Sequence, residues 1–286
     1  MTENKLKSIY NKIRTSNVYD VAIKSPLDYA KNSSKKLKNK IYIKREDLQP
    51  VFSFKLRGAY NKISKLKKKK HVNCIIAASA GNHAQGVALS AKKLGLKAII
   101  VMPMTTPKIK IDAVKSLKAK VILHGDAYDD AYEFAKLKAK KEHLDFIHPY
   151  DDLDVIAGQG TIAQEIIDQL DSKPDYIFIP VGGGGLLAGI TAYMNYESPK
   201  TKIIAVEPND SDCFNQAFKS KKRVKLTNIG IFADGVAVKQ IGKHTFELTK
   251  NKVFSSILVT TDAICAGIKD IYDETRTIDG PEGCGL

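Results

Sequence analysis

The chain has 286 residues, of which 43% are hydrophobic, and this is enough to bury the core of one large soluble domain or two medium-sized ones. No apolar run is long enough to span a membrane and the N-terminal segment lacks the apolar stretch of a secretory signal, so we expect a cytoplasmic protein without membrane contacts. The formal net charge of +15 comes mainly from lysines, clustered at 35–40 and 65–71 without interleaved aromatic rings, so we expect solvated surface there and no nucleic-acid partner.

Helical and strand patterns alternate along the chain. The first clear helix follows Lys55, where apolar residues recur at helical spacing. Five near-continuous apolar runs then predict strands that are covered on both faces of a parallel sheet: 74–79, 97–102, 120–124, 176–181 and 202–207. Between them, one helix is predicted after 79–86 and another after Pro107. This alternation indicates an α/β protein with open, doubly wound sheets.

The strongest local signal is "VGGGGLLAG" at 181–189, which follows a predicted strand and opens a predicted helix. Four consecutive glycines remove every Cβ from the turn, so several backbone N–H groups can converge on an anion near the positive end of the helix. The stretch is neither a P-loop nor a dinucleotide-binding fingerprint, and a single phosphate monoester fits it best. The alternative is a glycine turn that only allows close packing.

A second loop, "SAGNHAQG" at 79–86, has the same placement between a predicted strand and a predicted helix. Its Ser79, Asn82, His83 and Gln85 suit a carboxylate or a ring hydroxyl better than a metal ion. The alternative for His83 is a helix-capping or core histidine, which is the more common role of a single histidine.

Lys55 lies between apolar side chains in "SFKLRGAY" at 53–60, where a charged amine is costly and its pKa tends to fall. Ligands bind outside the carboxyl ends of the strands in such sheets, so we expect this amine and the two loops to share one ligand. A phosphorylated aldehyde held as a Schiff base on Lys55 would use all three, and pyridoxal 5'-phosphate is such a molecule. Phe54 could pack on its ring.

Taken together, these motifs resemble the threonine/serine dehydratases (threonine deaminases) of pyridoxal-phosphate fold type II. The resembling segments span nearly the whole chain in the expected order: 42–59, 77–88, 148–162, 181–189, 206–208 and 233–238. The resemblance implies two open doubly wound sheets of the tryptophan-synthase-β-like type, with the cofactor in the cleft between two lobes. We expect residues 1–67 and 153–286 to form the large cofactor-binding lobe, C-terminally incomplete, and residues 68–152 to form the small lobe.

Carried over position by position, the resemblance implies a role for each motif residue. Lys55 would form the Schiff base with pyridoxal 5'-phosphate and act as the catalytic base, while Phe54 would contact the cofactor ring. Asn82 would hydrogen-bond the ring hydroxyl. The other site residues form two groups, of which the first binds the substrate carboxylate and the second binds the cofactor phosphate: Ser79, Ala80, Gly81 and His83, and Gly182, Gly183, Gly184, Gly185 and Leu186.

Two departures from related serine racemases bear on the reaction and on metal binding. Those relatives carry a second serine after the position of Ser79, as the acid/base on the face opposite the lysine, and Ala80 in its place favours dehydration over racemisation. They also bind a divalent metal through the glutamate of "VEP" and an acid six residues later. Glu207 is present but Cys213 occupies the later position, so no metal is expected and Glu207 is only a weak candidate ligand.

The end of the chain also departs from the family pattern. After "TRTI" at 275–278, Gly280 stands where the family has glutamate and Cys284 where it has alanine. The later Ser-Gly-[GA]-Asn strand of the family, whose serine meets the pyridine nitrogen, does not occur in this sequence. We therefore expect a form that ends at Leu286 to bind the cofactor weakly and to turn threonine over poorly.

The function implied by the resemblance is the deamination of L-threonine to 2-oxobutanoate and ammonia, or of L-serine to pyruvate and ammonia, by a threonine ammonia-lyase of isoleucine biosynthesis. One alternative is another fold type II enzyme, such as a racemase or a β-replacement enzyme. Another is an impaired form that only binds a phosphate ligand. The amino-acid substrate is the expected small-molecule partner, and we expect a homo-oligomer, either a dimer or a tetramer.

Overall fold

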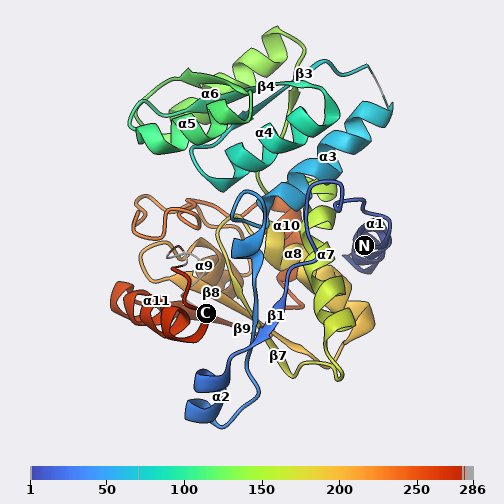
Figure 1. Cartoon of the computed structure of the whole chain (residues 1–286), viewed down its shortest axis with the longest axis vertical. Helices are drawn as coiled ribbons and strands as arrows, with labels where there is room; N and C mark the ends of the chain where they lie inside the picture. Colours follow the sequence, from blue (N-terminus) through green and yellow to red (C-terminus); the bar gives the residue numbers. More distant parts are fainter. Residues whose placement is uncertain (1, 70, 279, 281–286) are drawn as a thin grey trace. The chain divides into compact units, whose positions relative to one another are not determined.

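The computed structural model describes residues 2–69, 71–278 and 280, and the chain divides into two compact units (Figure 1). The units consist of the following segments: 1–15, 25–45 and 160–286 in unit 1, and 16–24 and 46–159 in unit 2. The boundary between 159 and 160 falls inside helix α7 (Leu153–Gln169). Each unit contains a parallel sheet of its own.

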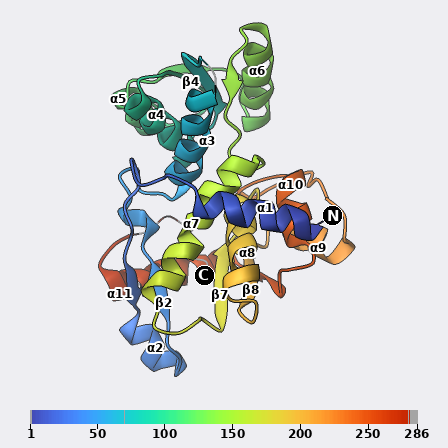
Figure 2. The same ribbon diagram turned by 90° about the vertical axis from the view of Figure 1, so that its right-hand side faces the viewer.

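Unit 2 contains a four-stranded parallel sheet with the strand order β5-β4-β3-β6. Its strands are β3 (Cys74–Ala78), β4 (Lys97–Met102), β5 (Lys120–Leu123) and β6 (Asp145–Phe146). One face of the sheet shares an apolar core with three helices, namely α3 (Lys55–Lys69), α4 (Asn82–Leu94) and α5 (Lys108–Ser116). The other face packs against α6 (Tyr128–Lys141), so helices cover both faces (Figure 2).

Burial explains why the apolar runs form these strands. In β3, Ile75 and Ala77 point into the core shared with α4, while Ile76 and Ala78 point into the core shared with α6, and all four are completely buried. A strand covered on both faces needs an apolar side chain at every position, which produces the near-continuous runs seen in the sequence. Pro107 directly precedes α5, as predicted for a helix start.

Unit 1 contains a three-stranded parallel sheet with the order β7-β8-β9 and a separate two-stranded antiparallel ribbon. The strands are β7 (Tyr176–Pro180), β8 (Lys202–Pro208) and β9 (Ser255–Val259) in the sheet, and β1 (Leu27–Tyr29) and β2 (Tyr42–Lys44) in the ribbon. The helices are α1 (Thr2–Arg14), α2 (Lys31–Leu37), α8 (Gly185–Glu197), α9 (Cys213–Ser220), α10 (Lys243–Thr249) and α11 (Thr261–Thr275). The N-terminal helix α1 packs against α8 and α10 (Figure 2).

The predicted α/β architecture with parallel sheets is confirmed. Each of the five predicted strands is present, with bounds that differ from the expected ones by at most one residue. Strands β1, β2, β6 and β9 were not predicted, and the first three are only two or three residues long, which is too short for a periodic pattern. No helix in the described part of the chain is long and apolar enough to cross a membrane. The lobe boundaries after 67 and 152 stay a prediction.

Within unit 2, helices α3 and α7 touch through glycine backbones. A Cβ added to Gly158 on α7 would lie 2.6 Å from the carbonyl oxygen of Arg57 and 2.6 Å from the Cα of Gly58, both on α3. Backbone atoms cannot move aside as the end of a side chain can, so the close crossing of the two helices depends on glycine at this position.

We predict that Gly158→Ala lowers the free energy of unfolding by about 2 kcal/mol, because the added methyl group overpacks the helix crossing. Equilibrium unfolding in urea measures this. The matched control is Gly81→Ala, since a Cβ at Gly81 meets no heavy atom within 4 Å, and it should change the free energy of unfolding by less than about 0.5 kcal/mol. Equal effects of the two substitutions would contradict the prediction.

Candidate active site

Lys55 is the first residue of α3, and the turn before the helix sets its position. Its side chain is half-buried and precedes the completely buried Leu56. The backbone N–H of Lys55 donates a hydrogen bond to Oγ of Ser53 at 3.3 Å. Phe54, which is expected to contact a cofactor ring, is also half-buried. The amine of Lys55 is therefore carried by the N-terminal turn of a helix whose other residues form much of the core.

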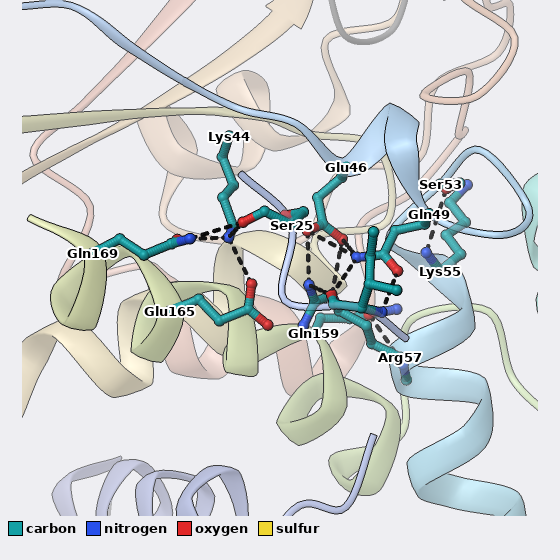
Figure 3. Close-up of polar contacts among 12 residues, drawn as sticks. Ser25, Lys44, Glu46, Gln49, Ser53, Lys55, Arg57, Gln159, Glu165 and Gln169 are labelled. Atoms are coloured by element: carbon teal, nitrogen blue, oxygen red, sulfur yellow. Dashed lines mark hydrogen bonds and ion pairs between the residues drawn. The ribbon is translucent and has the colours of Figure 1, made fainter. Parts of the chain in front are cut away.

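The side chain of Arg57 ties the first turn of α3 to the segment before it (Figure 3). Arg57 is completely buried, and its Nε and one terminal nitrogen donate to the two carboxylate oxygens of Glu46, both at 2.8 Å. The same terminal nitrogen donates to the carbonyl oxygen of Ile23 at 3.1 Å, and Gln49 donates to that oxygen at 2.9 Å. A bidentate pair fixes the orientation of both partners. The backbone at Lys55, two residues before Arg57, is held by this network.

Lys44 is the other lysine of the segment 42–59, and it lies on β2 in unit 1. Its Nζ donates to three acceptors, namely the carbonyl oxygen of Ser25 at 2.8 Å, Oε2 of Glu165 at 2.6 Å and Oε1 of Gln169 at 2.9 Å (Figure 3). The side chain of Lys44 is 10% exposed and that of Glu165 is 1% exposed. A buried carboxylate at this distance stabilises the charged ammonium, so Lys44 is suited to an ion pair rather than to nucleophilic chemistry.

The loop at 79–86 lies beside the start of α3, because α4 and α3 touch through their backbones at Gly86. A Cβ on Gly86 would lie 3.0 Å from the backbone nitrogen and the Cα of Leu56, and 3.2 Å from the carbonyl carbon of Lys55. Only residues 79–81 connect β3 to α4, and residues 82–86 form the start of α4. Five of its residues are half-buried: Ser79, Ala80, Gly81, Asn82 and Gln85. The structure therefore brings Lys55 and this loop together within unit 2.

His83 is completely enclosed at the start of α4. Its Nε2 lies 3.0 Å from the carbonyl oxygen of Ile147, so the ring proton belongs on Nε2, and Nδ1 has no hydrogen-bond partner among the described residues. Burial lowers the pKa of His83 to about 3, and the positive charge of Lys55 adds to this effect. The imidazole is therefore neutral and cannot offer a positive charge to a carboxylate. Only its backbone N–H, at the helix N-terminus, suits the predicted role.

The glycine loop, defined as residues 182–185, connects β7 to α8 in unit 1. Gly184 has a φ of +86°, a left-handed conformation that favours glycine. A Cβ on Gly182 would lie 2.9 Å from the carbonyl oxygen of Val236, so the segment 233–238 packs directly against the loop. In the described part of the chain, the backbone N–H groups of 182–186 have no protein acceptor. A phosphate group supplies the acceptors that such a cradle requires.

The carboxylate of Glu207 has a structural role that the sequence did not reveal. One oxygen accepts a hydrogen bond from the backbone N–H of Phe214 at 2.8 Å and the other from that of Asn215 at 2.7 Å, so Glu207 caps the N-terminus of α9. Burial raises the pKa of Glu207 to about 8 against the opposing effect of these hydrogen bonds, and burial also raises the pKa of the neighbouring Cys213 thiol. No group of three metal-ligating side chains occurs among the residues that the structure describes.

The last motif residues lie at the end of the chain. Gly280 is exposed. Cys284 and Leu286 are outside the described residues.

Comparison with known proteins identifies the family. Residues 18–285 match the family described as "Pyridoxal-phosphate dependent enzyme". The chain belongs to this family. Its fold type II architecture is confirmed by solved structures of the family. The processed form of threonine deaminase isoform 2 from Solanum lycopersicum covers 98% of this chain with a TM-score of 0.95 and 48% identity, and 77% of that chain is matched. Maize serine racemase covers 97% of this chain with a TM-score of 0.92 and 27% identity, and 86% of it is matched.

The similar curated sequences are threonine dehydratases, the family that the motifs resemble. A biosynthetic, chloroplastic threonine dehydratase from Arabidopsis thaliana is 55% identical over 271 residues, which are 95% of this chain and 46% of the relative. The chain spans about half the length of the curated relatives it matches. The family cofactor is the one predicted, and the cradle at 182–186 fits its phosphate.

We predict that Arg57→Leu lowers the free energy of unfolding by about 3 kcal/mol, because it leaves the carboxylate of Glu46 without its buried partner. The double substitution Arg57→Leu/Glu46→Leu should recover most of this loss, since it removes both charges. Urea unfolding measures both variants. As a control, Lys138→Ala on α6 removes an ion pair with Glu142, the residue that follows the helix, and a surface pair of this kind is worth less than about 1 kcal/mol. A double variant as unstable as the single one would argue against the prediction.

We also predict a pH dependence of stability from Glu207. Its folded-state pKa of about 8 lies above its ordinary value of 4.5, so between these values the folded state holds a proton that the unfolded state has released. The free energy of unfolding therefore falls as pH rises from 4.5 to about 8. In unfolding experiments at several pH values, Glu207→Gln should reduce the slope of the free energy of unfolding against pH. The reduction should correspond to at most about one bound proton. The control Glu133→Gln, at an exposed position, should keep the original slope. If Glu207→Gln also kept the original slope, the pKa of Glu207 would not be raised and the prediction would be wrong.

Proposed function

We propose that this chain deaminates L-threonine to 2-oxobutanoate and ammonia, with L-serine as a second substrate that yields pyruvate and ammonia. The structural observation that supports the proposal is the backbone contact at Gly86, where the first turns of α4 lie against the backbone of Lys55 and Leu56. The N-terminus of α4 is suited to a carboxylate. The names of the similar proteins support the same reaction, since these proteins are called threonine dehydratase or threonine deaminase.

In this proposal, pyridoxal 5'-phosphate supplies an electron sink for the electron pair that remains when the substrate loses its α-proton. Lys55 would hold the cofactor aldehyde through Nζ, and the same amine would take the α-proton of the bound substrate. The ring of Phe54 would pack on the cofactor, and the side-chain amide of Asn82 would donate to its ring hydroxyl. Ser79, Ala80, Gly81 and His83 would form the substrate carboxylate site, and the backbone N–H groups of 182–186 would bind the phosphate.

Ala80 supports elimination over racemisation. Racemisation needs a proton donor on each face of the α-carbon, and Ala80 carries no ionisable group. The side chain is half-buried in the loop beside the start of α3. The proposal therefore gives Lys55 the only proton transfer at the α-carbon.

We also propose that the protein is a homo-oligomer in solution, either a dimer or a tetramer.

The test is Lys55→Ala, with cofactor attachment as the primary readout. After incubation with pyridoxal 5'-phosphate and reduction with borohydride, peptide mapping of the unsubstituted chain should find the cofactor on Lys55. The variant should lose this label and the release of ammonia from L-threonine. Lys68→Ala, at an exposed position on the same helix, is the matched control and should keep both.

Two outcomes would count against the proposal. Label on a different lysine would overturn the assignment of Lys55. Label on Lys55 without ammonia release from either amino acid would overturn the proposed reaction and favour a chain that only binds the cofactor.

A further inference from the structure

The carbonyl oxygens of the glycine loop are held by hydrogen bonds from other parts of unit 1. The carbonyl oxygen of Gly183 accepts from Oγ1 of Thr245 at 2.8 Å and from the backbone N–H of Gly242 at 3.2 Å. The carbonyl oxygen of Gly182 lies 3.7 Å from Sγ of Cys213, which donates to it. These contacts leave the carbonyl groups occupied on the side of the loop that faces α9 and α10.

Because the carbonyl groups are held, the geometry of the peptide bond determines where the N–H groups point. In a trans peptide, the C=O of one residue and the N–H of the next point in opposite directions within one plane. The hydrogen bond from Thr245 draws the carbonyl of Gly183 toward α10, so the N–H of Gly184 points away from α10. It is one of the N–H groups that have no acceptor in the described part of the chain.

Thr245 is packed tightly against the loop. It is completely buried, and a Cβ on Gly184 would lie 3.1 Å from both the Cβ and Oγ1 of Thr245. The hydroxyl therefore has little freedom to choose another acceptor, and the peptide plane between Gly183 and Gly184 has little freedom to rotate.

We infer that Thr245 is a positioning residue for phosphate recognition. Its hydroxyl fixes the peptide plane between Gly183 and Gly184, so that the N–H of Gly184 is already aimed at the cofactor phosphate before binding. This inference rests on the proposed function, because it assigns the phosphate of pyridoxal 5'-phosphate as the group that the loop binds. A preset donor costs no reorganisation when the anion binds, and its loss should weaken phosphate binding specifically.

Thr249 provides a matched control on the same helix. It is also completely buried, but its Oγ1 donates within α10, to the carbonyl oxygen of Thr245 at 2.8 Å. Thr→Val keeps the side-chain shape and removes one hydroxyl at either position. The two substitutions thus remove the same group at the same depth, and only Thr245→Val removes a hydrogen bond to the glycine loop.

The experiment titrates the 286-residue chain, freed of cofactor, with pyridoxal 5'-phosphate and separately with pyridoxal, which lacks the phosphate. Thr245→Val should weaken binding of pyridoxal 5'-phosphate about tenfold, the equivalent of one hydrogen bond, and should leave pyridoxal binding within about twofold. Thr249→Val should leave both affinities within about twofold. Thr245→Ser keeps the hydroxyl and should bind pyridoxal 5'-phosphate as the unsubstituted chain does.

Equal losses for the two ligands in Thr245→Val would overturn the inference, because they would indicate a general structural defect. So would an unchanged affinity for pyridoxal 5'-phosphate in a chain that binds it. If the unsubstituted chain failed to bind pyridoxal 5'-phosphate at all, the proposed function would fall, and the inference with it. Should the valine variant not fold, Thr245→Ala compared with Thr245→Ser makes the same test of the hydroxyl.

Discussion

Contacts between glycine backbones fix the helix that begins with Lys55. Gly86 brings the backbone of α4 against residues 55 and 56, and Gly158 brings that of α7 against Arg57 and Gly58. Neither neighbouring helix can shift along α3 without backbone atoms colliding, because no side chain separates them. The bidentate pair of Arg57 with Glu46 adds a buried connection to the segment before the helix. The rest of the proposed chemistry depends on these contacts, because they fix the backbone from which the side chain of Lys55 extends.

Both loops expected to bind anions offer backbone N–H groups rather than charged side chains. Residues 79–86 include the start of α4 and residues 182–185 lead into α8, so each loop lies at the positive end of a helix. Backbone donors have no side-chain rotamers to lose on binding, and neighbouring hydrogen bonds set their direction. The lysines of 35–40, which contribute to the positive net charge, belong to neither loop and are all exposed.

Two residues that looked like ligands have structural roles in the described chain. The carboxyl group of Glu207 accepts hydrogen bonds from two backbone N–H groups of α9, which are the kind of donors that a helix N-terminus otherwise leaves unpaired. His83 is buried and neutral, and its ring is anchored to the carbonyl oxygen of Ile147. In both cases the side chain makes hydrogen bonds with backbone groups that the residue type alone did not indicate. The side chain of His83 is therefore that of a core histidine. The proposed contact with a carboxylate depends on the backbone N–H of His83.

The sequence by itself determined the parallel sheets and the family, because a strand buried on both faces requires the unbroken apolar runs of β3 or β8, and the glycine loop requires four adjacent residues. It also placed Lys55 at the start of a helix. Only the tertiary structure decided that Arg57 pairs with Glu46 and that the hydroxyl of Thr245 reaches Gly183, 62 residues away. It likewise decided the short strands β1, β2 and β6, which exist through their pairing partners. The reason is physical: apolar periodicity records which face of an element is buried, whereas hydrogen bonds depend on distances of a few ångström between segments that the chain order leaves unspecified.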